Sequence, residues 1–195
     1  MLDYFPIFAT PVFKGHIDIP DGSLPYWLTK SDLSSGRKKS NRGGWQSKDC
    51  RNDPYLNPLK TYLANAVSAF RLQSAWVNIN RKGDENVPHC HPGADLSFVW
   101  YLTDSTGLKL QNPNVFNQFR ILREFEHKEG HFYESINFSF AAGDIIIFPS
   151  AIVHSVVEHK EDEPRVSISG NLEWKPPVTA ETEALTLSQL APLNL

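Results

Sequence analysis

The chain has 195 residues, of which 41% are hydrophobic, 12% aromatic and 21% charged, and this composition excludes disorder along its whole length. Its 19 basic and 22 acidic side chains give a net charge of −3. Proteins built around nucleic acid need a net basic face to displace counterions, so no nucleic-acid partner is expected. The one basic cluster, Arg37-Lys38-Lys39, is short.

Two cysteines, Cys50 and Cys90, are too few for a disulfide framework, and they indicate a reduced, cytoplasmic protein. No apolar run approaches the roughly 18 residues of a membrane span. The longest such run covers residues 145–148. Residues 1–6 show no basic segment followed by an apolar core, so no signal peptide is expected. The sequence therefore predicts no membrane partner.

Repeats, linkers and low-complexity tracts are absent from the sequence, so a single domain over residues 1–195 is expected. Residues 1–75 are expected to contain an N-terminal strand over 8–19, a loop and a supporting helix. Residues 76–174 are expected to form a β core, and residues 175–195 a tail.

The loop and the helix can be placed more closely. Residues 20–53 are polar and rich in turn-forming residues, which predicts a long loop. Within it, the two glycines of segment 42–47 allow close backbone approach, so this segment is a candidate lid over a substrate. A helix is predicted over 57–72, because Asn57 can cap it, Pro58 suits its first turn, and apolar residues recur at spacings of three and four. It should cover one face of a sheet.

From residue 75 onward the chain consists of short segments rich in β-branched and aromatic residues, separated by turns. Eight such segments favour a mainly β fold, either a barrel or a sandwich. An exposed edge strand near the N-terminus would make a homodimer easy to accommodate, so a homodimer is possible. Three tryptophans, Trp76, Trp100 and Trp174, are expected to fill the core. The predicted strands are 75–82, 95–103, 107–111, 116–125, 131–140, 144–148, 153–159 and 164–173.

Two histidines lie two residues apart in His89-Cys90-His91, bracketed by Pro88 and Pro92. In an extended segment, side chains at i and i+2 project from the same face, so both imidazoles can reach one metal ion. Pairs of this kind also occur by chance in surface turns. Taken alone, the pair is weak evidence for a metal site.

Two further patterns follow downstream. His154 comes soon after the apolar run 144–148, at a strand end that suits a ligand. Arg165 and Ser167 share one face of the last predicted strand, where a guanidinium beside a hydroxyl can hold one end of a dicarboxylate. Taken singly, these residues have ordinary explanations, a partly buried histidine and an exposed strand arginine. Their occurrence together with the histidine pair, in this order, makes them stronger evidence for a functional site.

In this order, the patterns resemble the Fe(II)/2-oxoglutarate-dependent oxygenases. Within that superfamily the chain is similar to small prolyl-hydroxylase-like proteins of bacteria and phages. Segment 5–12 also resembles the start of those proteins. The likeness covers about residues 76–173 and is carried by Trp76-Val77-Asn78, Lys82-Gly83-Asp84, His89-Cys90-His91-Pro92, Leu96 to Leu102, Gly143-Asp144 to Pro149-Ser150, His154 and Arg165-Val166-Ser167.

The resemblance implies a mainly β double-stranded β-helix, a cupin-like jelly roll, with one or two supporting helices. It implies a dioxygenase that uses Fe(II), 2-oxoglutarate and O2 to hydroxylate an unactivated C–H bond, releasing succinate and CO2. The substrate would be peptidyl, with prolyl among the candidates, or a small molecule, in a bacterial or phage-infected cell. His89 and His154 would bind the iron, and Arg165 with Ser167 would bind the distal carboxylate of 2-oxoglutarate.

The chain departs from the usual pattern of this superfamily at one ligand. Most of these oxygenases have a carboxylate two positions after the first histidine, where this chain has His91. His91 is favoured as the third ligand because its spacing needs no special turn, and Asp95 stays open as an alternative if the turn at 92–93 folds back. Tyr101 and Asn78 are expected on strands that line the barrel, where either can hydrogen-bond 2-oxoglutarate or the substrate, or simply occupy a half-solvated sheet.

Two alternative functions come from other classes. One is a cupin-like metalloenzyme with three histidines that uses no 2-oxoglutarate, and the other is a non-catalytic β-barrel binding protein. Arg165 argues against the first, because only an enzyme that uses 2-oxoglutarate needs a cation facing the metal. Measured metal affinity tests the second, since a barrel without catalysis has no reason to hold Fe(II) with open coordination positions.

Overall fold

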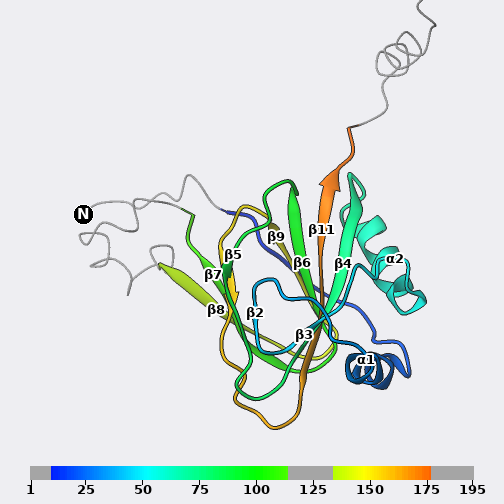
Figure 1. The fold of residues 1–195 in the computed structure, drawn as a ribbon. Coiled ribbons are helices and arrows are strands. Elements are labelled where there is room, and N and C mark those ends of the chain that lie inside the picture. The colour runs from blue at the N-terminus through cyan, green and yellow to red at the C-terminus, as the bar shows by residue number, and fades with distance from the viewer. Residues whose placement is uncertain (1–9, 114–133, 177–195) are drawn as a thin grey trace, which may run out of the picture.

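The computed structural model describes residues 10–113 and 134–176, and the strands among them form two antiparallel β-sheets (Figure 1). The helices are α1 (Ser23–Asp32) and α2 (Asn57–Ala66), and a short 3-10 helix (Pro54–Leu56) precedes α2. The strands are β1 (Phe13–His16), β2 (Asn41–Arg42), β3 (Trp45–Gln46), β4 (Phe70–Asn80), β5 (Glu85–His89), β6 (Leu96–Tyr101), β7 (Ser105–Gln111), β8 (Ser135–Phe140), β9 (Asp144–Pro149), β10 (His154–Val156) and β11 (Arg165–Trp174).

The strand order identifies the architecture. One sheet has six strands in the order β1-β9-β6-β11-β4-β3, and the other has five in the order β2-β5-β10-β7-β8. Among the described strands from β4 to β11, successive strands alternate between the two sheets, except that β7 and β8 both lie in the five-stranded sheet and pair there. This winding makes a double-stranded β-helix. The prediction of a mainly β fold of this type is confirmed.

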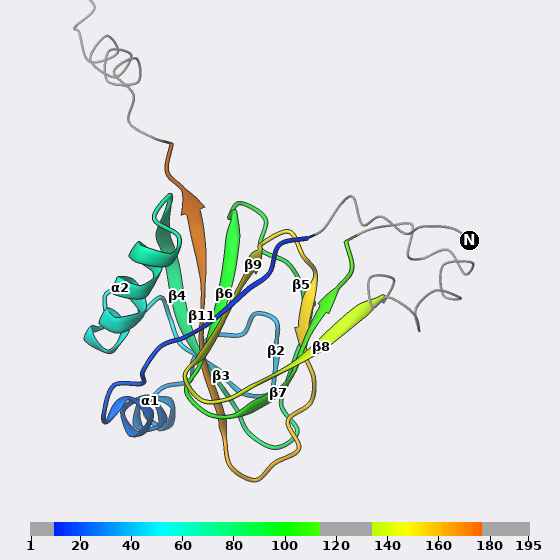
Figure 2. The ribbon, with the colours of Figure 1, turned by 180° about the vertical axis from the view of Figure 1, so that it is seen from behind.

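The six-stranded sheet is covered by both helices on its outer face, next to β4 (Figure 2). Side chains alternate between the two faces of a strand, so Val77 and Ile79 of β4 point outward into the helix-covered layer. There they pack in one cluster with Trp27 of α1 and with Leu59 and Leu63 of α2. The prediction that a helix covers one face of a sheet is therefore confirmed.

The inner face of the same sheet packs against the five-stranded sheet. Ile146 and Phe148 of β9 meet Leu108 and Leu110 of β7 in a second apolar cluster. Tyr101 of β6 is stacked on Phe140, with ring centroids 4.4 Å apart. This cluster closes one part of the space between the sheets and leaves the part nearer β4 and β11 to polar side chains.

The predicted long loop over 20–53 is wrong for much of its length, because it contains α1, β2 and β3. Helix α1 buries Trp27 against the core, where it is 1% exposed. The carboxylate of Asp53 accepts hydrogen bonds from Tyr26 Oη at 2.6 Å and Lys30 Nζ at 3.1 Å. This short helix depends on partners more than 20 residues away, and a local pattern does not reveal them.

The predicted helix over 57–72 is too long. Helix α2 ends at Ala66, because Val67 leaves the helical region with φ −137° and ψ 55°. Phe70 instead begins β4 and pairs with Trp174 of β11. Apolar spacing alone favoured a longer helix, but pairing with a strand about a hundred residues away ended it.

Other predictions need smaller corrections. In the described part of 8–19 only β1 is a strand, and residues 85–89 form a strand, β5, that was not predicted. Trp100 is fully buried as expected, whereas Trp174 is 51% exposed and Trp76 is half-buried, so neither fills the core. The predicted strand 116–125 lies outside the described residues, as does the expected tail from residue 177 onward.

Both cysteines are free, as the sequence predicted. Burial raises the pKa of the Cys50 thiol to about 11, so this thiol stays protonated at neutral pH. Cys90 is exposed. Within the described ranges, no helix has both the length and the hydropathy required to cross a membrane.

Candidate active site

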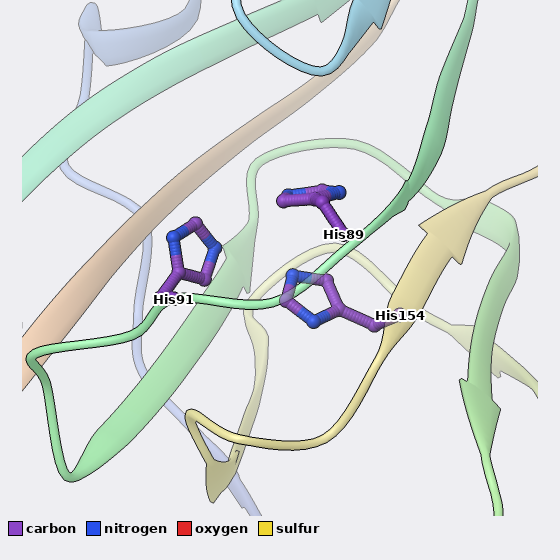
Figure 3. Close-up of side chains that lie close together, drawn as sticks. All are labelled: His89, His91 and His154. Carbon is purple, nitrogen blue, oxygen red and sulfur yellow. The ribbon is translucent and has the colours of Figure 1, made fainter.

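Three histidines converge between the two sheets, and their rings point toward one another in Figure 3. His89 is the last residue of β5 and His154 the first of β10, and the two are direct partners in the strand pairing. His91 follows β5 by two residues, and its backbone N–H donates to the carbonyl of Ser150 at 3.0 Å. The pairing of two strands from distant parts of the chain therefore brings the three imidazoles together.

The spacing of the rings suits a single ion. One potential ligand nitrogen from each histidine lies within 4.8 Å of the others. Nitrogen ligands about 2.0–2.1 Å from a metal ion are at most roughly 4.2 Å apart, so small inward side-chain movements are sufficient. Ring centroids are 5.0 Å apart for His89 and His91, 4.3 Å for His89 and His154, and 5.1 Å for His91 and His154.

Backbone carbonyls orient two of these rings. Nδ1 of His89 lies 2.8 Å from the carbonyl oxygen of Val87, and Nδ1 of His154 lies 2.9 Å from that of Ile152. Because a carbonyl can only accept, each Nδ1 carries the proton and each Nε2 keeps its lone pair for a metal. A hydrogen bond of this kind is the usual support behind a metal-binding histidine.

Burial keeps the three rings uncharged at neutral pH. It lowers the pKa of His154 to about 4, with the nearby His89 and His91 adding to the effect. Burial, followed by the proximity of His89, likewise lowers the pKa of His91 to about 4. The pKa of His89 is also lowered by burial. Neutral imidazole is the form that binds a metal, so all three are ready to do so near pH 7.

Arg165 is a buried cation in the same space, with 3% of its surface exposed. Two of its nitrogens donate to the carbonyls of Thr106 and Val157, at 3.2 and 3.3 Å. Among the described residues no carboxylate lies within ion-pair distance of it. Burial lowers the pKa of the guanidinium, yet arginine stays charged in proteins. An unpaired buried cation is costly, so this position calls for an anionic ligand.

We call the space that contains these groups the inner cavity. It contains about 540 Å³ of space that no atom fills, including the part open to solvent. Alternate residues of β4 and of β11 face it, and Asn78 Nδ2 donates to Ser169 Oγ at 3.0 Å across the strand pair. The predicted site residues that line it are Asn78, His89, His91, Tyr101, His154, Arg165 and Ser167.

Sequence analysis missed several polar residues of this cavity. Asn80 and Ser169 lie two positions beyond Asn78 and Ser167, on the same strand faces. Asn80 Nδ2 lies 3.4 Å from Oδ1 of Asn86, which in turn donates from Nδ2 to Ser40 Oγ at 3.2 Å. The alternation of polar residues along β4 and β11 was the available signal for Asn80 and Ser169.

Asp95, the alternative third ligand, is placed elsewhere. It is exposed, and its carboxylate accepts a hydrogen bond from the backbone N–H of Trp174 at 2.7 Å. The group of potential metal ligands contains the three histidines and not Asp95. The turn at 92–93 therefore does not bring this carboxylate to the histidines.

The predicted lid over 42–47 is largely tied to the sheets. Arg42 pairs with Glu85 of β5, and Trp45 and Gln46 pair with Ile79 and Asn78 of β4. These residues extend both sheets by one short strand each. Gln46 also lines a second hollow, which we call the outer groove and which opens beside the histidines.

The outer groove and the inner cavity share Ser40, Trp76, His89 and His91, so these two histidines line both, whereas His154 lines the cavity. Trp76 lies beside His91, with ring centroids 5.5 Å apart. The groove contains about 1390 Å³ of empty space, including the part open to solvent. Its other lining residues are Arg37, Lys38, Lys39, Gln46, Asp49, Ser74, Val87, Cys90 and Asn171.

Solved structures with a similar fold come from several proteins. HygX from Streptomyces hygroscopicus, with nickel, 2-oxoglutarate and hygromycin B bound, has a TM-score of 0.60 and 12% identity over 85% of this chain and 84% of that one. SnoN, a non-heme alpha ketoglutarate dependent epimerase from nogalamycin biosynthesis, has a TM-score of 0.57 and 16% identity over 89% and 84% of the two chains. A Pseudomonas putida prolyl-4-hydroxylase has a TM-score of 0.55 and 12% identity over 86% and 95%.

Likenesses at such low identity show the fold alone, and no curated protein sequence matches the chain. The sequence model of one protein family, described as "Putative 2OG-Fe(II) oxygenase", does match, over residues 74–171. That segment is half of the chain and contains the three histidines and the buried Arg165. The chain therefore belongs to the 2OG-Fe(II) oxygenases, enzymes that use Fe(II), 2-oxoglutarate and O2.

Proposed function

We propose that this oxygenase hydroxylates an unactivated C–H bond of its substrate. One oxygen atom of O2 enters the new hydroxyl group, and the other enters succinate as 2-oxoglutarate loses CO2. The observation that carries the proposal is the buried Arg165, which lacks a carboxylate partner among the described residues and shares its cavity with three convergent histidines. A metal chelator with an anionic far end fits both features.

The residues present fit an Fe(II) ion. His89, His91 and His154 would hold it through three nitrogen ligands on one side, leaving positions open for 2-oxoglutarate and O2. Bound Fe(II) supplies the activation of O2 that protein side chains cannot provide. Three neutral imidazoles leave both positive charges of the ion uncompensated, whereas a carboxylate ligand would cancel one. The dianionic cosubstrate then supplies the missing negative charge.

Arg165 and Ser167 would bind the distal carboxylate of 2-oxoglutarate. They lie two residues apart on β11 and both line the inner cavity. The guanidinium has five N–H donors and gives two nitrogens to backbone carbonyls, so donors remain for a ligand. Tyr101 and Asn78 on the neighbouring strands can add hydrogen bonds to the cosubstrate or the substrate. Apolar side chains such as Phe148 and Leu108 exclude water around them.

The substrate class in this proposal is a peptidyl group, prolyl included, or a small molecule. Both kinds are represented among proteins with a similar fold, namely the Pseudomonas putida prolyl-4-hydroxylase and HygX with hygromycin B bound. His89 and His91 line the outer groove, so a substrate seated there would present its C–H bond to the metal.

The test is an anaerobic titration of the full chain with Fe(II) and then with 2-oxoglutarate. A chelated keto acid should produce a visible charge-transfer band. Arg165→Ala should weaken cosubstrate binding by about 10- to 100-fold, because a charge-assisted contact contributes roughly 1.5–3 kcal/mol. Arg81→Ala serves as the matched control, since Arg81 is exposed and pairs with Asp32.

The other outcomes separate the alternatives. Iron binding without the band would favour a metalloenzyme with three histidines that uses no 2-oxoglutarate. Absence of iron binding would favour a non-catalytic binding protein. A band of equal strength in the wild type and in Arg165→Ala would refute only the proposed role of Arg165, and the rest of the proposed function would stand.

A further inference from the structure

The outer groove carries positive charge that the proposed oxygenase chemistry does not use. Arg37, Lys38 and Lys39 are consecutive, exposed, and all line this groove. Within residues 10–113 and 134–176, none of the three side chains forms an ion pair. The whole chain has a net charge of −3, so this local excess of cations runs against the overall balance.

The opposite charge in the groove is already neutralised. Asp49 is the one carboxylate among its lining residues. Its Oδ2 lies 3.3 Å from Nε of Arg51, and its Oδ1 accepts hydrogen bonds from the backbone N–H groups of Arg51 and Ala75. The three cations therefore face a groove whose described lining residues include no free carboxylate.

The backbone that carries the cations is held in place on both sides. The N–H of Arg37 donates to the carbonyl of Gln46 at 2.7 Å, and the N–H of Lys39 donates to Oδ1 of Asn41 at 2.8 Å. Ser40 accepts from the N–H of Val87 on β5 at 2.9 Å. Segment 37–40 is thus anchored to β2, β3 and β5, and it forms a wall of the groove rather than a free loop.

We propose that the substrate carries a compact anionic group, such as a phosphate, which segment 37–39 binds while the histidines face the reacting carbon. This inference rests on the proposed function and adds a substrate class to it. Three consecutive residues span at most about 7.6 Å between their outer Cα atoms, so the charge is concentrated over a short distance. That concentration suits a multiply charged group better than single carboxylates spread along an acidic peptide. Trp76, beside His91 where groove and cavity meet, offers an apolar face for the rest of the substrate.

The test measures binding of inorganic pyrophosphate to the metal-free full chain by titration calorimetry at low ionic strength. The wild type should bind, and the triple variant R37Q/K38Q/K39Q should bind at least about tenfold more weakly, because charge-assisted contacts are lost. A glutamate hexapeptide should bind less tightly than pyrophosphate. Circular dichroism confirms that the variant remains folded.

The matched control removes the same charge elsewhere. K82Q/K160Q/K175Q replaces three exposed lysines that do not line either hollow, and it should change pyrophosphate binding less than about twofold. Equal losses in both triple variants would show a net-charge effect and overturn the proposal. So would unchanged binding in R37Q/K38Q/K39Q, no binding to the wild type, or tighter binding of the hexapeptide.

A third variant locates the bound anion. If Arg165→Gln abolishes pyrophosphate binding while R37Q/K38Q/K39Q does not, the anion sits in the inner cavity and the proposal fails. The measurement uses neither iron nor 2-oxoglutarate. A charge-transfer band without groove binding would therefore refute only this inference, whereas groove binding without the band would refute the proposed oxygenase chemistry.

Discussion

The inner cavity and the outer groove meet at the same histidines but are built in different ways. The cavity is lined by long central strands, and its ionisable groups are largely buried, with Arg165 and His154 only 3% and 5% exposed. The groove is lined by segment 37–40 and by residues of β3, β4, β5 and β11, and its cations are exposed. If the two proposals hold, the reaction depends on residues of long paired strands, whereas substrate choice depends on an exposed surface segment.

The two regions also differ in how many contacts hold them. Strand β11 pairs with β4 over ten residues and with β6 over six, so Arg165 and Ser167 sit in a continuous ladder. Segment 37–40 is held by three hydrogen bonds of its backbone groups and by one from Asn86 Nδ2 to Ser40 Oγ. We therefore expect changes at the two regions to have separable consequences.

The largest effect is expected from His154→Ala in the inner cavity. Loss of a ligand should weaken Fe(II) binding by at least about 100-fold, since even outer contacts of ligands contribute 10- to 100-fold. Anaerobic titration against a competing chelator measures it. His16→Ala is the control, because this exposed histidine lies on β1 away from both hollows. Unchanged affinity in His154→Ala would remove this residue from the ligand set.

The second largest effect is expected from acid, which should lower the stability of the metal-free protein through the histidines of the inner cavity. The pKa values of His91 and His154 are about 4 in the folded chain, below the ordinary value of 6.5. Between these values the unfolded chain takes up protons that the folded chain does not, so the metal-free protein should lose stability as pH falls from 6.5 to 4. Urea unfolding at pH 7 and pH 5 measures the loss.

Two carboxylates also have pKa values lowered by folding, but they affect stability in a different pH range. The pKa values of Asp53 and Asp144 lie below 3.8, so their contribution is lost only in stronger acid. The double variant His91→Gln/His154→Gln should therefore show a smaller difference between pH 7 and pH 5. An identical difference in the variant would assign the acid effect to other groups.

A smaller effect, confined to the outer groove, is expected from Gly36→Ala. Gly36 has φ +64°, and an added Cβ would lie 2.6 Å from Cδ1 of Trp45 and 2.9 Å from the carbonyl of Gln46. The substitution should cost about 1–3 kcal/mol and displace segment 37–39, weakening pyrophosphate binding while leaving the charge-transfer band intact. Gly83→Ala is the control, because its φ is +90° but nothing lies near its Cβ position. Equal effects on pyrophosphate binding would contradict the role of the Gly36 contact.

The smallest effect is expected from salt. Exposed charges are screened more than buried ones, and the screening length falls from roughly 10 Å at 0.1 M to about 3 Å at 1 M. Raising NaCl from about 0.05 to about 0.5 M should therefore weaken pyrophosphate binding several-fold and 2-oxoglutarate binding less than about twofold. Calorimetry and the charge-transfer band provide the two measurements. If salt weakened pyrophosphate and 2-oxoglutarate binding equally, the proposed difference between an exposed and a buried anion site would be refuted.

Much of the inner cavity could be predicted from sequence, and most of the outer groove could not. Arg165 and Ser167 share one face of β11 because they are two residues apart on the strand, whereas His91 lies two residues beyond the end of β5, so for His89 and His91 only the spacing was visible in the sequence. The cluster Arg37-Lys38-Lys39 was visible, but its position beside the histidines depends on the pairing of β2 with β5 and of β3 with β4. Strands of two residues leave no periodic signal.

Helix boundaries and tryptophan burial likewise divide into features that the sequence predicts and features that it does not. Leu59 and Leu63 were placed in a helix that covers a sheet, and both are buried there. The end of α2 at Ala66 and the exposure of Trp174 could not be predicted, because β4 and β11 pair over more residues than local propensity indicates.

The sequence by itself determined the mainly β fold, the winding implied by its family resemblance, and the side chains suited to iron and 2-oxoglutarate. Local periodicity is sufficient for the β segments, whereas the winding and the roles of these side chains are what the family resemblance implies. Only the tertiary structure decided that His91 joins His89 and His154 while Asp95 bonds to Trp174, that Arg165 is buried without a carboxylate among the described residues, and that segment 37–39 walls the groove. Each depends on contacts between distant parts of the chain, whose geometry no local pattern contains.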